Sequence, residues 1–194
     1  MQGRRLVLVA TAEPWHLSAA AEELGNALFK YDEDVEIRIE DCAPLLYVLS
    51  SRLSPTEAFR LVIREPPATV ERIVPVEHII NVRVSLDSHS HLRRFMETLI
   101  PALEGRIEGG ALGLEVKPRG FFLVGGNEKK WNRVLARLLS EAAGVRVLRK
   151  APSVVKLEDT RYGVVVAVIR SKWDRVQVWR SRRLGLPATE EGKR

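Results

Sequence analysis

A row of cations on one predicted helix is the strongest chemical signal in this sequence. Lys129, Arg133 and Arg137 recur every four residues, so on a helix they share one face, and Lys130 lies beside them. Ammonium and guanidinium groups bind phosphate oxygens, and arginine does so through two parallel N–H donors. The spacing therefore predicts a helix face that binds a polyanion such as a nucleic acid.

The segment just before this helix adds further candidate contacts. Lys117 and Arg119 lie at the end of a predicted strand, from which they can contact a sugar–phosphate backbone. Gly125 and Gly126 precede the helix N-terminus, whose free N–H groups can hold a phosphate. A turn that requires positive φ angles explains the same glycine pair, so both interpretations stay open.

A second cationic cluster occurs near the C-terminus. Residues 170–183, RSKWDRVQVWRSRR, contain six cations and one carboxylate, with Trp173 and Trp179 between them. Exposed tryptophans stack on unpaired bases, whereas the alternative is that at least one of them packs into the edge of a sheet. The sequence thus predicts the following RNA contacts: Lys117, Arg119, Lys129, Lys130, Arg133, Arg137, Lys172, Arg180, Arg182 and Arg183.

Signatures of catalysis and of metal or cofactor binding are absent from the sequence. It contains no P-loop, no G-x-G-x-x-G and no G-x-S-x-G motif. His89 and His91 do not share a helix face and have no third ligand nearby. Glu158 and Asp159 form a carboxylate pair, but without a base or nucleophile a turn is the better interpretation. We therefore expect no catalytic residue, no metal and no cofactor, and a protein that is not an enzyme.

The hydrophobic pattern predicts how the cations are positioned. Between Asn127, a good N-cap, and Gly144, a good C-terminal residue, apolar side chains recur at helical spacing. Hydrophobic strands at 154–157 and 162–169 follow, joined by a turn, and 176–179 is a candidate edge strand. The buried stripe of the helix is expected to comprise Trp131, Val134, Leu135, Leu138, Leu139 and Ala142.

The first half of the chain predicts a separate unit. Strand signals at 5–11, 35–40, 45–50 and 69–80 alternate with two helix signals in the order βαββαβ, the ferredoxin-like plan. The second of these helices starts at the capping box Ser54-Pro55-Thr56-Glu57. We therefore expect an α/β (α+β) protein with an N-terminal ferredoxin-like domain.

One more helix is expected between the two halves. Ser88 or Ser90 can cap it, and apolar residues from Leu92 to Leu103 recur at helical spacing. Pro101 lies inside this pattern and should kink the helix or end it early.

Charge is distributed unevenly along the 194 residues. Residues 1–84 contain 9 Lys and Arg against 13 Asp and Glu, a net charge of −4, whereas the remainder contains 22 against 12, a net charge of +10. The single cysteine, Cys42, excludes an internal disulfide, and no apolar run approaches the roughly 20 residues of a membrane span. We expect a cytoplasmic protein whose second half meets a polyanion.

Four segments resemble the THUMP-domain proteins: LVLVATAEPWHLSAAAEEL at 6–24, ERIVPVEHI at 71–79, LEVKPRGF at 114–121 and SVVKLEDTRYGVVVAVI at 153–169. The resemblance covers most of residues 1–170. It implies a THUMP-like RNA-binding domain at 81–183 after the ferredoxin-like domain at 1–80. Residues 184–194, which include Gly185, Pro187 and Gly192, are expected to form a flexible tail. Proteins of that family bind tRNA, generally by its acceptor arm and 3′ end, and deliver it to a methyltransferase, thiouridine synthetase or cytidine acetyltransferase.

The RIVPV segment at 72–76 and the lack of an appended catalytic domain resemble the stand-alone adaptors of tRNA cytidine acetylation. The function expected from the resemblance is therefore a tRNA-binding adaptor that presents tRNA to a separate modifying enzyme, such as an acetyltransferase. Two alternatives stay open. One is a protein-interaction scaffold with incidental RNA contact, and the other is a small enzyme with an unrecognised site.

Overall fold

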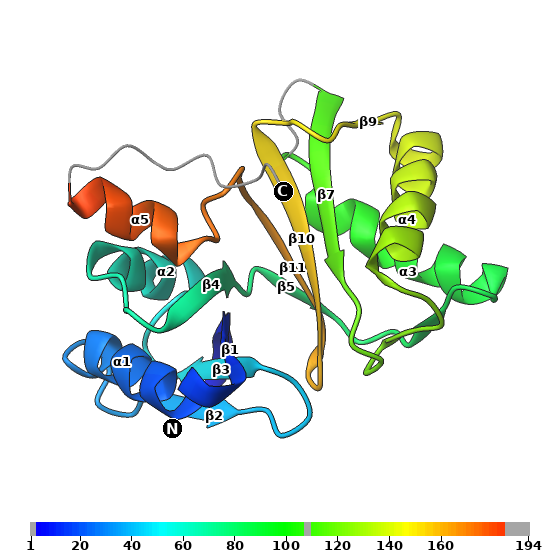
Figure 1. The fold of residues 1–194 in the computed structure, drawn as a ribbon. Helices are drawn as coiled ribbons and strands as arrows, with labels where there is room; N and C mark the ends of the chain where they lie inside the picture. The colour runs from blue at the N-terminus through cyan, green and yellow to red at the C-terminus, as the bar shows by residue number, and fades with distance from the viewer. Residues whose placement is uncertain (1–2, 107–109, 185–194) are drawn as a thin grey trace. The chain divides into compact units, whose positions relative to one another are not determined.

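The computed structural model describes residues 3–106 and 110–184, which form two compact units (Figure 1). Unit 1 comprises the described residues up to Pro75 and from Lys172 onward, and unit 2 is Val76–Ser171. The predicted tail lies outside the described residues except for Leu184.

Unit 1 contains a four-stranded antiparallel sheet in the order β2-β3-β1-β4. Its first elements follow one another as βαββαβ, so the order predicted from the sequence is confirmed. The elements are β1 (Arg5–Ala12), η1 (Pro14–His16), α1 (Leu17–Phe29), β2 (Glu36–Ile39), β3 (Leu45–Ser50), α2 (Pro55–Arg64), β4 (Val70–Pro75) and α5 (Val176–Arg183).

Local signals account for the helices that cover this sheet. On α1 the residues Ala20, Leu24 and Leu28 recur at helical spacing and are fully buried in the core of unit 1. The predicted capping box starts α2: Ser54 Oγ accepts the N–H of Glu57 at 3.3 Å, and Glu57 Oε2 accepts the N–H of Ser54 at 2.9 Å.

Residues 176–183 are a helix, so the predicted edge strand at 176–179 is wrong. The ion pair of Asp174 Oδ2 with Arg72 Nε, at 2.8 Å, and the hydrogen bond from the N–H of Ile73 to the Asp174 carbonyl, also 2.8 Å, fix the chain against β4. From this anchor α5 packs on α2 and β4, with Val176 buried in the core. Residues 172–183 therefore lie in unit 1, whereas the sequence placed them in the second domain.

Unit 2 contains a five-stranded mixed sheet in the order β5-β11-β10-β7-β9 and a two-stranded parallel sheet of β6 and β8. Strands β10 and β11 are antiparallel, and β7 is parallel to both β10 and β9. The elements are β5 (His78–Ile80), β6 (Val84–Ser85), α3 (His89–Leu103), β7 (Ala111–Lys117), β8 (Leu123–Val124), α4 (Glu128–Ala143), β9 (Arg146–Val147), β10 (Ser153–Thr160) and β11 (Gly163–Arg170).

Helices α3 and α4 cover the same face of the five-stranded sheet (Figure 1). Alternate strand residues such as Leu112 and Val116 on β7 share one core with Phe95 of α3 and with Trp131 and Leu135 of α4. This shared core fixes both helices by their apolar stripes and leaves their polar faces toward solvent.

Three features of the strands and helices differ from the sequence-based prediction. The expected strand at 69–80 is two strands, β4 and β5, which belong to different sheets. Strand β10 continues to Thr160, so Glu158 and Asp159 lie within it and the predicted turn there is wrong. Helix α3 continues past Pro101, because a proline in the last turn removes one hydrogen bond while the buried Leu99 and Leu103 hold the helix on either side.

Candidate nucleic-acid interface

Helix α4 is positioned by its two caps and its buried stripe. Asn127 Oδ1 accepts the N–H of Lys130 at 3.0 Å, and Gly144 ends the helix with a φ angle of 63°, so both predicted caps are confirmed. Trp131, Leu135 and Leu139 are fully buried. Val134 and Leu138 are half-buried against the same core, whereas Ala142, predicted to be buried, is exposed because it lines a groove.

The predicted cations of α4 lie together on its exposed face. Among residues 3–106 and 110–184, Lys129 and Arg133 have no ion-pair partner. Arg137 Nε lies 3.7 Å from Glu141 Oε1, in an exposed pair of the kind that contributes about 0–1 kcal/mol. Lys130 Nζ is 3.8 Å from Asp87 Oδ1, also exposed. These cations are therefore available to an external anion at little cost.

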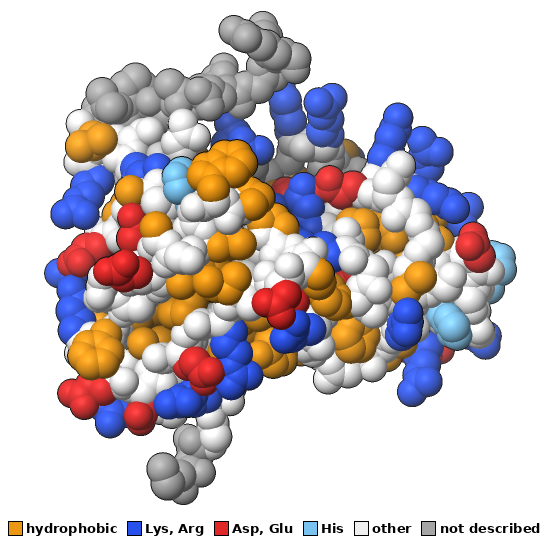
Figure 2. Space-filling view, turned by 60° about the horizontal axis from the view of Figure 1, so that its bottom comes forward, with side chains coloured by type: hydrophobic (Ala, Val, Ile, Leu, Met, Phe, Trp, Pro, Cys, Tyr) orange, Lys and Arg blue, Asp and Glu red, His pale blue; other side chains and the backbone are white. Residues whose placement is uncertain are grey.

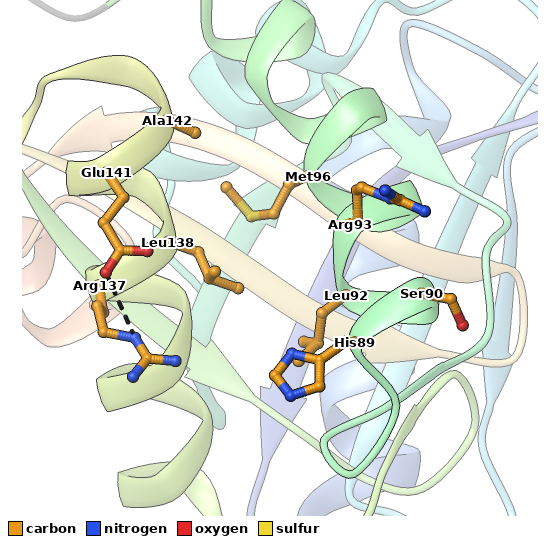
Figure 3. A pocket seen from close by; sticks show the side chains of 9 residues that line it. All are labelled: His89, Ser90, Leu92, Arg93, Met96, Arg137, Leu138, Glu141 and Ala142. Atoms are coloured by element: carbon orange, nitrogen blue, oxygen red, sulfur yellow. Dashed lines mark ion pairs between the residues drawn. The ribbon is translucent and has the colours of Figure 1, made fainter.

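A groove of about 730 Å³ separates α4 from α3. Figure 3 shows Met96 of α3 and Leu138 of α4 pointing into the space between the helices, with His89 and Arg137 at one end of it. Arg93 points to the far side of α3 in the same view. Apolar walls with cationic groups at the opening are a combination that can accept an unstacked base and its phosphate. The groove is lined by His89, Ser90, Leu92, Arg93, Met96, Arg137, Leu138, Glu141 and Ala142.

Sequence reasoning did not select His89 or Arg93. The helix pattern already placed both on the exposed side of the predicted α3, next to a basic run that includes Arg94. What the sequence could not supply is that α3 and α4 lie side by side, since that follows from the shared core. Figure 2 shows Lys and Arg side chains near histidine side chains at one end of the face that it presents.

Arg119 makes internal contacts that distinguish it from the cations of α4. Its Nη1 lies 2.8 Å from Glu158 Oε2 and donates to the carbonyls of Lys117 and Asp159, each at 3.3 Å. Its side chain is only 16% exposed. Lys117 is paired with Glu115 at 3.8 Å and with Glu128. Both predicted strand cations are therefore paired with carboxylates of unit 2, and their contact with RNA stays a prediction.

Asp159 fixes the loop that connects β7 to β8. Its Oδ2 accepts the backbone N–H groups of Arg119 and Gly120 at 2.8 Å and of Phe121 at 3.1 Å, and its Oδ1 accepts that of Phe122 at 2.8 Å. A buried carboxylate with four N–H donors is fully satisfied as an anion. The carboxylates of Glu158 and Asp159 therefore hold one loop of unit 2 in place.

The predicted contacts of the C-terminal cluster, Lys172, Arg180, Arg182 and Arg183, lie in unit 1, and two of them make internal contacts. Arg180 Nη2 donates to the Val70 carbonyl at 2.7 Å, and the Arg182 guanidinium lies 4.9 Å from the centre of the Trp179 ring. The rings of Trp173 and Trp179 meet edge to face at 5.1 Å, and Trp179 Nε1 donates to the Trp173 carbonyl at 2.8 Å. Both tryptophans are half-buried. Of the predicted contacts here, Lys172, Arg182 and Arg183 are exposed and Arg180 is half-buried.

The glycine pair before α4 has a structural explanation. Gly125 and Gly126 have φ angles of 79° and 126°, and a Cβ on Gly126 would lie 2.5 Å from Leu86 Cδ1. The turn requires these glycines whether or not a phosphate binds there.

The described residues contain neither a metal-binding cluster nor a membrane-spanning helix. Across residues 3–106 and 110–184, no group of three or more His, Cys, Asp or Glu side chains could hold a metal ion. None of the described helices has the length and apolarity needed to cross a membrane.

The architecture of this chain is a THUMP-like fold, as the sequence resemblance implied. It is similar to the crystal structure of PH1313 from Pyrococcus horikoshii Ot3, with a TM-score of 0.58 and 12% sequence identity over 86% of this chain and 55% of that chain. It is also similar to TrmN from Thermus thermophilus, with a TM-score of 0.54 and 18% identity over 89% of this chain and 47% of that chain.

The chain thus spans about half the length of these two proteins. In sequence, no protein-family model matches it, and no curated protein matches it either.

Proposed function

We propose that this protein binds RNA through the exposed face of α4 and the groove beside it. The observation that carries the proposal is the row Lys129, Arg133 and Arg137, which a buried stripe holds toward solvent with little or no neutralisation from neighbours. Release of counterions from the RNA backbone would drive binding, and the apolar walls of the groove would take an unstacked base.

The RNA that we propose is tRNA. A THUMP-like fold supports this choice, because the THUMP-domain family, which four segments of the sequence resemble, binds tRNA. We further propose that the chain is an adaptor that presents tRNA to a separate modifying enzyme, such as an acetyltransferase, and performs no chemistry itself. The carboxylates most suggestive of acid–base catalysis, Glu158 and Asp159, are buried and engaged with Arg119 and the β7–β8 loop, which supports a structural role for them.

The binding face is tested by titrating tRNA at several salt concentrations with Lys129→Gln, Arg133→Gln and Arg137→Gln combined. Loss of three phosphate contacts should reduce the slope of log K against log salt by about 3 and weaken binding at every salt concentration. The matched control combines Arg52→Gln, Arg60→Gln and Arg64→Gln, which removes the same charge from exposed positions in unit 1. Equal slopes for the two variants would overturn the assignment to α4.

The adaptor role is tested by capturing partners of the full chain from native lysate, with and without nuclease. We expect tRNA in the untreated sample, together with an enzyme that modifies tRNA. Recovery of proteins unrelated to tRNA modification, with no enrichment of RNA, would instead favour an interaction scaffold.

A further inference from the structure

A second cavity of unit 2 is lined by cations that the RNA-binding face does not include. Its volume is about 370 Å³. His91 and Arg94 reach it from α3, on a different face of that helix from the residues that line the α3–α4 groove. Arg83 reaches it from the segment before β6. The cavity is lined by Asn81, Val82, Arg83, Val84, Ser85, His91, Arg94 and Val124.

The charge of this cavity is one-sided. No carboxylate is among its lining residues, and within the described parts of the chain Arg83, His91 and Arg94 have no ion-pair partner. Two guanidinium groups in one hollow repel each other unless an anion lies between them. Ser85 and Asn81 add a hydroxyl and an amide that can donate further hydrogen bonds.

The walls of the cavity are held rigidly. Val84 is fully buried and its N–H donates to the Phe122 carbonyl at 2.7 Å, while the N–H of Leu86 donates to the Val124 carbonyl at 3.2 Å. Phe122 belongs to the loop that Asp159 fixes. The side chains of Val82, Val84 and Val124 supply an apolar wall, beside which hydrogen bonds to an anion are stronger than in open water.

We propose that this cavity binds a phosphate group of the RNA, between the guanidinium groups of Arg83 and Arg94 and beside His91. That the phosphate belongs to RNA rests on the proposed function, whereas the affinity of the cavity for phosphate does not. A phosphate offers acceptors to both guanidinium groups at once, and the cavity has no Phe, Tyr or Trp side chain on which a base would stack. The group is either a terminal phosphomonoester or an internal phosphodiester.

The affinity for phosphate can be measured without RNA. Titration of the full chain with inorganic phosphate is followed by ring-proton NMR of its four histidines, with His91 assigned by His91→Gln. A saturable shift of the His91 signals is expected, with at least tenfold weaker binding after Arg83→Gln and Arg94→Gln are combined. The control combines Arg146→Gln and Arg149→Gln, which removes the same charge from exposed positions of unit 2. No His91 shift, or equal loss in both variants, would overturn the site.

The source is decided with tRNA that carries either a 5′-phosphate or a 5′-hydroxyl. If removal of the 5′-phosphate weakens binding by the wild-type protein but not by the Arg83/Arg94 variant, the site holds the terminal monoester. If both tRNA forms bind equally well and the variant weakens both, the site holds an internal phosphodiester. If the variant binds both tRNA forms as tightly as the wild type, the cavity does not hold a phosphate of the tRNA. The assignment of RNA binding to α4 is tested separately, by its own salt titration.

Discussion

The two units of this chain carry charge differently. By residue count unit 1 has 15 Lys and Arg and 15 Asp and Glu, and is neutral, whereas unit 2 has 16 against 10 and carries the whole net charge of +6. The densest cationic run of the sequence, at 170–183, nevertheless falls mostly in the neutral unit. The density of arginines along the chain is therefore a poorer guide to a polyanion surface than the charge of the folded unit that carries them.

The two basic helices show why. On α5, Arg180 donates to the backbone of β4 and Arg182 covers Trp179, so these cations help to attach a short helix. On α4 the buried stripe and the hydrogen bond from the Val116 N–H to Asn132 Oδ1, at 3.2 Å, attach the helix to its unit. Lys129 and Arg133 have no ion-pair partner among the described residues. A helix with a complete apolar stripe can keep its cations for a ligand.

Charge reversal on the two helices should have the largest effect and tests the comparison directly. Lys129→Glu, Arg133→Glu and Arg137→Glu combined should weaken tRNA binding by about 100-fold or more, because attraction to phosphates becomes repulsion. Lys172→Glu, Arg182→Glu and Arg183→Glu combined should weaken it by less than about tenfold. Fluorescence anisotropy at one fixed salt concentration gives both values. A larger loss from the second variant would reverse the comparison.

Asp159→Asn should have the next largest effect, on stability. Three backbone N–H groups now donate to Oδ2. In the variant they would face either the NH2 group of the asparagine or its neutral carbonyl oxygen, so the free energy of unfolding should fall by about 3 kcal/mol. Urea denaturation monitored by circular dichroism measures the loss. Glu141→Gln, which changes an exposed carboxylate of the same unit, should leave the free energy within about 0.5 kcal/mol of the wild type. Equal stability of both variants would contradict the loop-holding role.

Arg180→Ala should separate stability from binding. Loss of the donor to Val70 O and of the half-buried stem should cost about 1–2 kcal/mol of unfolding free energy, with tRNA affinity unchanged within about twofold. Arg183→Ala, an exposed change on the same helix, controls for helix propensity. A large loss of tRNA affinity without loss of stability would show that α5 also binds RNA.

The sequence predicted those elements whose signals are local. The caps Asn127 and Gly144 defined α4. The order of strand and helix signals along the first 80 residues defined the βαββαβ unit. Each of these signals needs only neighbouring residues. It misassigned α5, whose position depends on the long-range pair of Arg72 and Asp174, and it ended β10 before the buried carboxylates, whose partners lie some 40 residues away in sequence.

In the candidate site, too, only the features with local signals could be predicted from the sequence. The face of α4 follows from helical spacing, whereas the groove and the second cavity require knowing that α3 lies against α4 and that Arg83 and Arg94 line one cavity. Hydrophobic periodicity says which face of a helix is buried, but not which other element covers it.

Removal of the α4 cap should have the smallest effect, and it compares the N-terminus of α4 with that of α5. Asn127→Ala removes the acceptor of the Lys130 N–H and should lower the free energy of unfolding by about 1 kcal/mol. Asn127→Ser keeps a capping oxygen and should restore most of it. The start of α5 has no side-chain cap, so Arg175→Ala should cause no comparable loss. Because the first turn of α4 carries Lys129, fraying should also weaken tRNA binding, by about twofold to threefold, in Asn127→Ala alone. If alanine and serine at position 127 gave equal stability and equal affinity, the cap would not be what orders the binding face, and the buried Trp131 one turn further on would have to hold it unaided.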